Sequence, residues 1–323
     1  MASIEWSSGR LRSVQDLTAD IRLFEIERDG PFMPAAPGAH INVGVEIAGR
    51  PDTRSYSVVG ADDDGLYRIA VKRVPQSRGG SAYMWSLAPG ARMRVSAPRN
   101  HFPLSLGKGD YFLVAGGIGI TPLYGMALAL AETGARFRLA YAARTRADLA
   151  FADVLAARLG DRLSLHIAAE GERIDLAAEI DALPADAELY ICGPLPMFEA
   201  ARRHWQTRGR APARFRFETF GSSGRYASEP FRVKIPRLGK DIVVPQNQSL
   251  LEALEDAGVE MISDCRRGEC GLCTLPILET DGIVDHRDVF FSDRQKAAGG
   301  KICTCVSRVS GGEIVLDTPD RAG

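Results

Sequence analysis

Three cysteines crowd into one polar stretch near the carboxyl end of the chain. Cys265, Cys270 and Cys273 lie in the sequence DCRRGECGLC, which also holds two glycines. No hydrophobic periodicity runs through the stretch, so it is neither an amphipathic helix nor a buried strand, and we predict an irregular loop. A polar loop with three cysteines can form a disulfide, a zinc site, a redox-active thiol pair or the ligands of an iron–sulfur cluster.

The spacing of these cysteines is C-x4-C-x2-C, and Cys303 and Cys305 follow later in the chain. This is the ligand spacing of a plant-type [2Fe–2S] ferredoxin. The backbone N–H groups of such a loop must point at the sulfurs, and Gly268 and Gly271 supply the backbone freedom that this requires. Structural zinc usually takes its ligands as two short pairs, and a redox Cys-x-x-Cys normally begins a helix. We therefore predict a cluster, with zinc as the alternative.

The composition limits the class of protein and its setting. The chain has 323 residues, of which 45% are hydrophobic and 25% charged, as is typical of a soluble globular protein of two or three domains. A net charge of −1 gives no indication of nucleic acid or a membrane surface as a partner. The opening sequence MASIEWSSGRLRS lacks the apolar core of a signal peptide, so we expect a cytoplasmic, reducing setting, which counts against disulfides.

The uncharged stretch 111–131 is long enough to span a bilayer, but the sequence GGIGITP in its middle would break a single helix. We predict instead a buried strand over 111–115, a glycine loop over 116–119 and a helix with Pro122 in its first turn. Strand, glycine loop and helix in this order form an anion-binding unit.

The patterning changes twice along the chain. In residues 1–106, short apolar or alternating runs are separated by Gly, Pro and Asp, which predicts a small antiparallel β-barrel. In residues 107–224, strand-like runs alternate with helical stretches, which predicts a parallel sheet covered by helices. The Gly- and Ser-rich sequence 221–230 is typical of a linker. Residues 225–323 form the third predicted domain.

The third domain begins with predicted strands at 231–235 and 241–244, followed by a helix. Ser249 and Glu252 have the spacing of a capping box at the start of that helix. Gly258 is predicted to end it, and the cysteine loop comes next.

Two short motifs in the barrel predict an anion site. Gly79, Gly80 and Ser81 precede a helical stretch and offer N–H groups and a hydroxyl to a phosphate. Arg54, in the motif RSYS, could add a charge-assisted contact, and Tyr56 could lie along a flat ring. The alternative interpretation of RSYS is an ordinary strand.

In the second domain the glycine loop departs from the dinucleotide fingerprint, because Pro122 replaces the third glycine. Two other strands end in Arg144 and in Cys192-Gly193-Pro194, at the sheet edge where ligands of open α/β sheets collect. The alternative is that Cys192 belongs to the core and that Gly-Pro is only a turn.

In their order along the chain, these motifs resemble the phthalate dioxygenase reductase family, which also includes vanillate demethylase reductases. The resemblance covers essentially the whole chain through RSYS, AVKR, RGGS, PRNHFPL, GGIGITP, YICGP, FETF and the cysteine loop. It implies an antiparallel β-barrel that binds FMN, an α/β parallel-sheet domain that binds NADH and a β-grasp [2Fe–2S] ferredoxin domain.

The resemblance also implies a residue set for each cofactor. FMN would be held by Arg54, Ser55, Tyr56, Ser57, Val71, Lys72, Arg73, Gly79, Gly80 and Ser81, with Glu218 and Phe220 closing its pocket. NADH would be held by Gly117, Ile118, Gly119, Thr121, Arg144, Cys192 and Gly193. Ser57, near the flavin N5, and Cys192, beside the nicotinamide, are the candidate catalytic residues. Arg144 together with Arg146 leaves NADPH open.

For the cluster, the resemblance implies the ligands Cys265, Cys270, Cys273 and Cys305. The sequence Cys305-Val306-Ser307 matches the ferredoxin ending, which makes Cys303 a buried neighbour. Cys303 remains the alternative fourth ligand.

The implied function is that of an oxygenase reductase: hydride passes from NADH to FMN, and electrons leave singly through the cluster. The histidines are scattered and form no evident iron site, so we expect oxygen chemistry on a separate partner. That partner would be a Rieske-type non-haem iron oxygenase acting on a small aromatic or amine substrate, docked near Arg266 and Arg267. The alternatives are an FAD-dependent reductase for a di-iron monooxygenase and a zinc-stabilised binding module. We expect a monomer.

Overall fold

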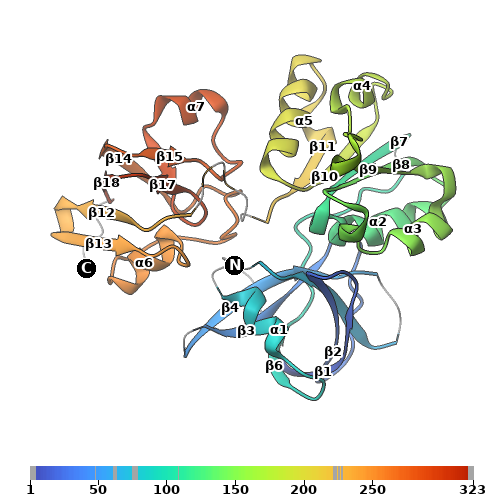
Figure 1. Ribbon diagram of the computed structural model, residues 1–323, viewed down its shortest axis with the longest axis horizontal. Coiled ribbons are helices and arrows are strands. Elements are labelled where there is room, and N and C mark those ends of the chain that lie inside the picture. The colour runs from blue at the N-terminus through green and yellow to red at the C-terminus, as the bar shows by residue number, and fades with distance from the viewer. Residues whose placement is uncertain are drawn as a thin grey trace. The chain divides into compact units, whose positions relative to one another are not determined.

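Figure 1 shows the computed structural model of the chain. The structure describes residues 5–47, 49–60, 64–74, 79–107, 109–220, 224, 226 and 228–318. The chain divides into two compact units, Met1–Glu218 and Thr219–Gly323. The first unit contains two sheets of different kinds, and the second contains a smaller mixed sheet.

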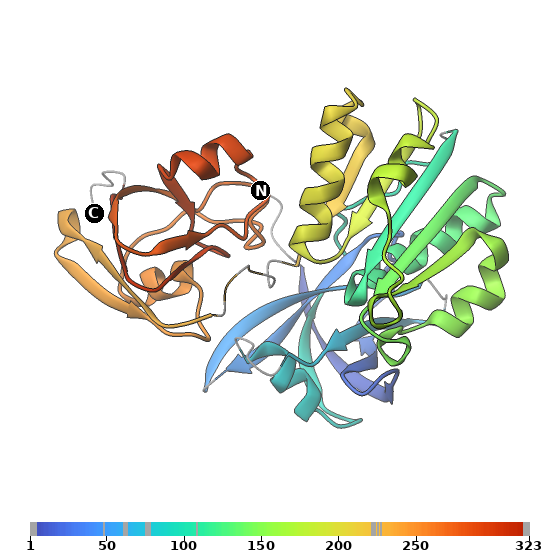
Figure 2. The ribbon, with the colours of Figure 1, turned by 45° about the horizontal axis from the view of Figure 1, so that its top comes forward.

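The amino-terminal part of the first unit is a six-stranded antiparallel sheet in the order β4-β3-β6-β1-β2-β5, which curls into a half-barrel (Figure 2). Its core holds Leu11, Phe24, Ile41 and Tyr67, because alternate residues of each strand face inward. A bridge between Val58 and Ile69 joins the two edges of the sheet. The elements are β1 (Trp6–Asp16), β2 (Ile21–Arg28), β3 (His40–Ile47), β4 (Arg50–Ser57), β5 (Leu66–Lys72), α1 (Gly80–Ser86) and β6 (Arg92–Ser96).

The remainder of the first unit is a five-stranded parallel sheet in the order β11-β10-β7-β8-β9. Helices α2 and α3 pack together on one face of the sheet, and α4 and α5 on the other (Figure 1). The elements are β7 (Asp110–Gly116), α2 (Ile120–Glu132), β8 (Arg136–Ala143), α3 (Ala152–Leu159), β9 (Leu163–Ile167), α4 (Leu176–Asp181), β10 (Glu188–Cys192), α5 (Leu195–Thr207) and β11 (Phe215–Glu218). Single 3-10 turns are η1 (Gly117–Gly119), η2 (Arg146–Asp148), η3 (Gly160–Arg162), η4 (Ala168–Glu170) and η5 (Pro212–Arg214).

The apolar stretch 111–131 folds as predicted into strand β7, a glycine turn and helix α2. Helix α2 has 13 residues, and Pro122 lies in its first turn, where a missing N–H costs nothing. Within the described ranges, no helix has both the length and the apolar character that crossing a bilayer requires.

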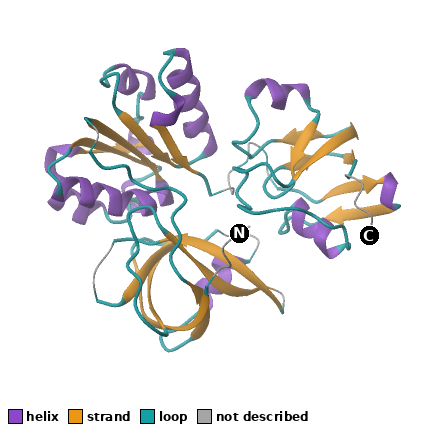
Figure 3. Ribbon diagram, turned by 180° about the vertical axis from the view of Figure 1, so that it is seen from behind, coloured by secondary structure: helices purple, strands orange, loops and turns teal. Residues whose placement is uncertain are grey.

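The second unit is a five-stranded sheet in the order β13-β12-β18-β14-β16, beside a two-stranded pair β15-β17 (Figure 3). Helix α6 covers the sheet, and the predicted capping box forms: Ser249 Oγ accepts from Glu252 N at 3.1 Å, and Glu252 Oε2 accepts from Ser249 N at 2.8 Å. The elements are β12 (Phe231–Ile235), η6 (Pro236–Leu238), β13 (Lys240–Val244), α6 (Leu250–Asp256), β14 (Thr274–Thr280), β15 (Ile283–Asp285), α7 (Asp293–Ala298), β16 (Lys301–Cys303), β17 (Arg308–Ser310) and β18 (Glu313–Leu316). The three predicted fold classes are thus confirmed.

Candidate functional site

The cysteine loop between α6 and β14 is irregular and curls around one sulfur atom. Cys265 Sγ accepts hydrogen bonds at 3.4 Å from each of the backbone N–H groups of Arg267, Glu269 and Cys270. Donors aimed at a sulfur stabilise a thiolate, which is the form that binds iron. The donor set therefore fits a cluster ligand, as the sequence predicts.

Positive φ angles produce this curl. The φ angle is +49° at Arg266, +78° at Gly268 and +75° at Gly271. Two features exclude a side chain at Gly268. The positive φ disfavours one, and a Cβ there would lie 2.6 Å from Val306 Cγ2 and 2.9 Å from Asp288 Cα. Glycine at this position lets the loop pack closely on its neighbours.

Two candidates for the fourth ligand lie near Cys273. Hydrogen bonds from Cys303 and Cys305 lower the pKa of the buried Cys273 thiol to about 3, and the same bonds raise the pKa values of Cys303 and Cys305. Cys305 also accepts from the N–H of Gly268 and interacts with Cys265, whereas Cys303 interacts with Asp288. Cys305 therefore faces the cysteine loop, which favours it over Cys303.

Within the described residues, no group of three or more His, Cys, Asp or Glu side chains is arranged to hold a single metal ion. A [2Fe–2S] cluster divides its four thiolates between two irons, so its ligands need not converge on one point.

Thr219 anchors the cysteine loop within the second unit. Glu269 Oε1 accepts from the N–H of Thr219 at 3.1 Å. The Thr219 hydroxyl has two acceptors within reach, Glu269 Oε1 at 3.1 Å and Arg267 O at 3.3 Å, and its one hydrogen serves either of them. Thr219 belongs to the motif FETF, in which only Glu218 and Phe220 have a role predicted from the sequence. Phe220 follows it and is 38% exposed.

Within the first unit, the structure brings Ser57 and Glu218 together. Ser57 ends strand β4, Glu218 ends strand β11, and both are buried. Ser57 Oγ donates to Glu218 Oε2 at 3.4 Å. The two residues predicted to flank the flavin ring therefore meet, although they are far apart in the sequence.

The motifs predicted to hold a phosphate also meet. A Cβ on Gly80 would lie 2.6 Å from Arg54 Nε, so the guanidinium of Arg54 rests directly on the backbone at the start of α1. Gly79 has a φ of +88°, and Ser81 Oγ accepts from Val74 N at 3.2 Å. Arg54 Nη1 is also 2.6 Å from Asp52 Oδ2. Arg78 of the motif RGGS lies outside the described residues.

Of the other predicted flavin residues, Ser55 and Tyr56 lie on β4, Val71 and Lys72 lie on β5, and Arg73 follows β5. Ser55 Oγ donates to Asn42 Oδ1 at 2.5 Å, and burial raises the pKa of Tyr56. Val71 is buried, Lys72 Nζ pairs with Asp20 Oδ2 at 3.1 Å, and the Arg73 guanidinium lies 5.6 Å from the centre of the Trp85 ring.

In the parallel sheet, the glycine turn and the end of β10 are in close contact. A Cβ on Gly119 would lie 2.1 Å from Cys192 O, and a Cβ on Gly193 would lie 3.1 Å from Gly116 Cα. Gly117 has a φ of +54° and open space beside it, so its backbone is accessible to a ligand. Thr121 Oγ1 donates to Ile118 O at 3.0 Å, which stiffens the turn.

Cys192 itself is 1% exposed and packs in the core of this domain. This burial matches the structural alternative raised from the sequence, and its role beside the nicotinamide stays a prediction. Arg144, at the end of β8, is exposed. Arg146 forms a two-pronged ion pair with Glu170, at 2.8 and 2.7 Å.

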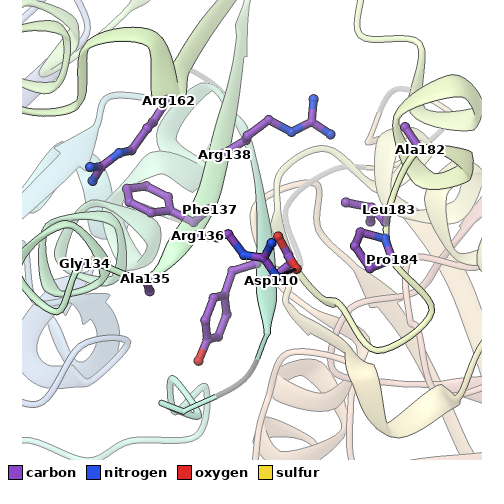
Figure 4. A pocket seen from close by; sticks show the side chains of 11 residues that line it. Asp110, Gly134, Ala135, Arg136, Phe137, Arg138, Arg162, Ala182, Leu183 and Pro184 are labelled. Atoms are coloured by element: carbon purple, nitrogen blue, oxygen red, sulfur yellow. Dashed lines mark hydrogen bonds and ion pairs between the residues drawn. The ribbon is translucent and has the colours of Figure 1, made fainter.

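Two hollows lie away from these residues. One, of about 570 Å³, lies at the amino ends of β7 and β8, at the opposite sheet edge from the glycine turn (Figure 4). Its side chains Arg136, Arg138 and Arg162 point in different directions, and the first two pair with Asp110 and Glu179. The other, of about 580 Å³, lies over the outer face of the barrel beside Trp6 and Gly44. No residue of the predicted cofactor sites lines either hollow.

Comparisons with known proteins agree with this arrangement. Residues 8–103 match the model of an oxidoreductase FAD-binding domain, residues 113–203 that of an oxidoreductase NAD-binding domain, and residues 233–310 that of a 2Fe-2S iron-sulfur cluster binding domain.

Known proteins also match this chain over nearly its whole length. The phenoxybenzoate dioxygenase subunit beta of Ectopseudomonas oleovorans is 38% identical over 95% of this chain and 96% of its own length. The heme-dependent oxidative N-demethylase beta subunit of Ectopseudomonas mendocina is 36% identical over 95% of this chain and 97% of its own length. A solved structure of phthalate dioxygenase reductase is 33% identical, the match covers 97% of this chain and 98% of that chain, and the two superpose with a TM-score of 0.76.

Proposed function

Because this chain belongs to the phthalate dioxygenase reductase family, and is therefore an NADH-dependent flavin and iron–sulfur oxidoreductase, we propose that it is the reductase component of a multicomponent oxygenase. In this proposal it takes hydride from NADH onto FMN and delivers electrons singly, through a [2Fe–2S] cluster, to a Rieske-type non-haem iron oxygenase that acts on a small aromatic or amine substrate. The observation that carries the proposal is the set of three N–H donors on Cys265, in a chain that also matches flavin- and NAD-binding domains.

The bound cofactors would supply hydride acceptance and one-electron transfer, and the protein's part is to bind and orient them. Ser57 would place its hydroxyl at the flavin N5, and the buried Glu218 carboxylate fixes the direction of that hydroxyl. Gly80 and Arg54 would hold the phosphate, because the guanidinium lies against the backbone at the start of α1. No general base is required for hydride transfer, so these residues act by position.

On the nucleotide side, the backbone of Gly117, Ile118 and Gly119 would approach the NADH, with Thr121 holding the turn. The contact between Gly119 and the Cys192 carbonyl fixes the turn against the end of β10. Arg144 is an exposed cation at the same sheet edge, where it could contact a ribose or phosphate.

For the cluster we propose Cys265, Cys270, Cys273 and Cys305 as ligands. The N–H groups on Cys265 and the N–H of Gly268 on Cys305 would adjust its reduction potential. The zinc alternative has no comparable support, since the matched family model describes an iron–sulfur domain.

We propose that the partner docks at the cysteine loop. Arg266 is 47% exposed and pairs with Glu255 at 2.7 Å, and Leu272 and Phe290 are also exposed. The side chain of Arg267 is only 14% exposed and lies 3.4 Å from Glu269, so it supports the loop rather than forming the docking face expected from the sequence.

One experiment tests the cofactor content. Protein purified under argon should be brown-yellow, release FMN on acid treatment, contain about two irons and two sulfides per chain, and bleach when NADH is added. Release of FAD would contradict the flavin assignment and favour a reductase of the di-iron monooxygenase kind. Absence of acid-labile sulfide would refute the whole electron-transfer proposal.

A second experiment tests the partner class. One relative is named as a subunit of a phenoxybenzoate dioxygenase and another as a subunit of a heme-dependent oxidative N-demethylase, so a haem oxygenase is the alternative to a Rieske partner. We expect the NADH-reduced protein to reduce a Rieske oxygenase component faster than a haem oxygenase component under argon. The reverse order of rates would assign a haem partner instead.

A further inference from the structure

A buried carboxylate lies behind the cysteine loop and has no role in the proposed function so far. The side chain of Asp288 is 0% exposed. Its Oδ1 accepts from Ser307 Oγ at 3.1 Å and lies 3.3 Å from His286 Nδ1, and its Oδ2 accepts from the N–H of Phe291 at 2.9 Å. A buried charge with this many partners is fixed in place.

Asp288 and the residues after it contact the cysteine loop at Gly268. The carbonyl of Gly268 accepts from Val289 N at 3.0 Å and from Phe290 N at 3.2 Å. The missing side chain of Gly268 leaves room for Asp288, whose Cα would lie 2.9 Å from a Cβ there. Gly268 lies in the sequence between the proposed ligands Cys265 and Cys270. This contact therefore fixes the position of the cysteine loop relative to Asp288.

Asp288 also contacts the segment that carries the fourth proposed ligand. Ser307 lies two residues after Cys305, and its hydroxyl accepts from Arg287 N at 3.2 Å while donating to Asp288. The N–H of Ser307 donates to Cys303 O at 3.0 Å. Asp288 therefore links two stretches of chain that must meet at one cluster.

The carboxylate is ionised at neutral pH. Burial raises the pKa of Asp288, but hydrogen bonds from His286 and Phe291 outweigh it and hold the pKa below its usual value. Lys296 Nζ donates to the backbone carbonyl of Asp288.

We propose that Asp288 is a positioning residue for the [2Fe–2S] cluster, which joins the loop bearing Cys265 and Cys270 to the segment bearing Cys305 and lowers the reduction potential of the cluster by its buried charge. The inference rests on the ligand set proposed above. Reduction adds one electron to a group that is already negative, so a fixed negative charge nearby opposes it.

The test compares three variants of the full-length holoprotein. Asp288→Asn removes the charge and keeps the shape, while Ser307→Ala removes the link to the fourth-ligand segment and keeps the charge. Asp293→Asn removes an exposed carboxylate of the same unit, at the start of α7, and is the matched control. The readouts are the cluster midpoint potential, from a redox titration followed by EPR, and the rate at which a chelator removes iron.

For Asp288→Asn we expect the ratio of reduced to oxidised cluster at a fixed solution potential to rise about tenfold, a shift of about 59 mV for a one-electron couple. Iron loss should be faster in both Asp288→Asn and Ser307→Ala, and only the first should shift the potential. Asp293→Asn should change neither. A midpoint of Asp288→Asn equal to that of Asp293→Asn, with unchanged iron loss, would overturn the inference.

A further variant covers the case in which Asp288→Asn assembles no cluster. Lys296→Met removes the cation that contacts the Asp288 carbonyl, so it should lower the midpoint potential. If Lys296→Met leaves the midpoint unchanged and Ser307→Ala leaves iron loss unchanged, the inference is wrong. Wild-type protein without any cluster would instead refute the proposed function itself.

Discussion

Gly268 shows at the residue scale how one missing side chain can control a metal site. Gly268→Ala should destabilise the second unit by about 2 kcal/mol or more, because a Cβ there meets Val306 and Asp288 in addition to the cost of a positive φ. Iron content after purification, with thermal unfolding of the same samples, would measure the effect.

Gly258→Ala is the control for this prediction. Gly258 also has a positive φ, +76°, but a Cβ there has open space. It should cost about 1 kcal/mol and leave the iron content at the wild-type value. Equal iron loss in the two variants would mean that strain alone, and not the contact with Asp288, disturbs the loop.

Ser57 is the residue-scale test of the flavin site. Ser57→Ala should slow flavin reduction by NADH about tenfold, because the hydroxyl that Glu218 orients is lost from the proposed N5 position. Anaerobic stopped-flow absorbance gives the rate. Ser13→Ala is a matched control, since Ser13 Oγ donates to Glu25 Oε2 at 2.7 Å in the same barrel, away from the proposed site. An unchanged rate in Ser57→Ala would remove Ser57 from the mechanism.

At the scale of elements, an ion cluster joins α4 to α5. Asp181 Oδ1, at the end of α4, lies 2.7 Å from Arg208 Nε and 2.8 Å from His204 Nε2, and these two contacts lower the pKa of Asp181 to about 2 from 3.8. A carboxyl with a lowered pKa stabilises the fold above its unfolded pKa and loses that contribution as pH falls through the folded value.

The pH dependence of stability follows from this sign. Between pH 3.8 and about pH 2, the wild-type parallel-sheet domain should lose stability more steeply than Asp181→Asn does. Circular dichroism during urea unfolding at several pH values measures the two slopes. Parallel curves for the two proteins would show that the cluster contributes nothing.

The turns after β8 and β9 hold a second ion pair, between Arg146 and Glu170. Arg146 Nε and Nη2 both donate to the carboxylate of Glu170, so they are not available to a 2′-phosphate. This ion pair therefore favours NADH over NADPH as the electron donor. Glu170→Gln should raise the NADPH-to-NADH ratio of kcat/KM about tenfold by releasing Arg146. Glu172→Gln, which removes a charge two residues away, is the control and should leave the ratio near the wild-type value.

The elements were largely predictable from sequence, and the reasons are local. The boundaries of β12 and the capping box of α6 follow from period-two patterning and from Ser249 and Glu252. The burial of individual side chains was not predictable, because it depends on segments that are far away in the sequence. Cys192 is covered by the core of its domain, Arg267 lies against Glu269, and Asp288 is buried by the chain around Ser307.

At the scale of the whole molecule, the proposal fixes how many electrons one chain takes up. Full reduction should require three electrons, two for the flavin and one for the cluster, and an anaerobic dithionite titration counts them. Cys305→Ser should lower the count to two with loss of the cluster signal in EPR. Cys303→Ser should keep all three. Loss of the cluster in Cys303→Ser alone would exchange the roles of the two cysteines.

The tight contact between Gly119 and the carbonyl of Cys192 has a consequence for protein engineering. A substitution at Gly119 would push the end of strand β10 aside before it altered any preference among coenzymes. A library that aims to switch the electron donor should therefore leave the turn untouched and vary the rim at Arg144, Arg146 and Glu170, where side chains have room to change. Natural chains of this kind that come to use another electron donor would be expected to change at the same positions.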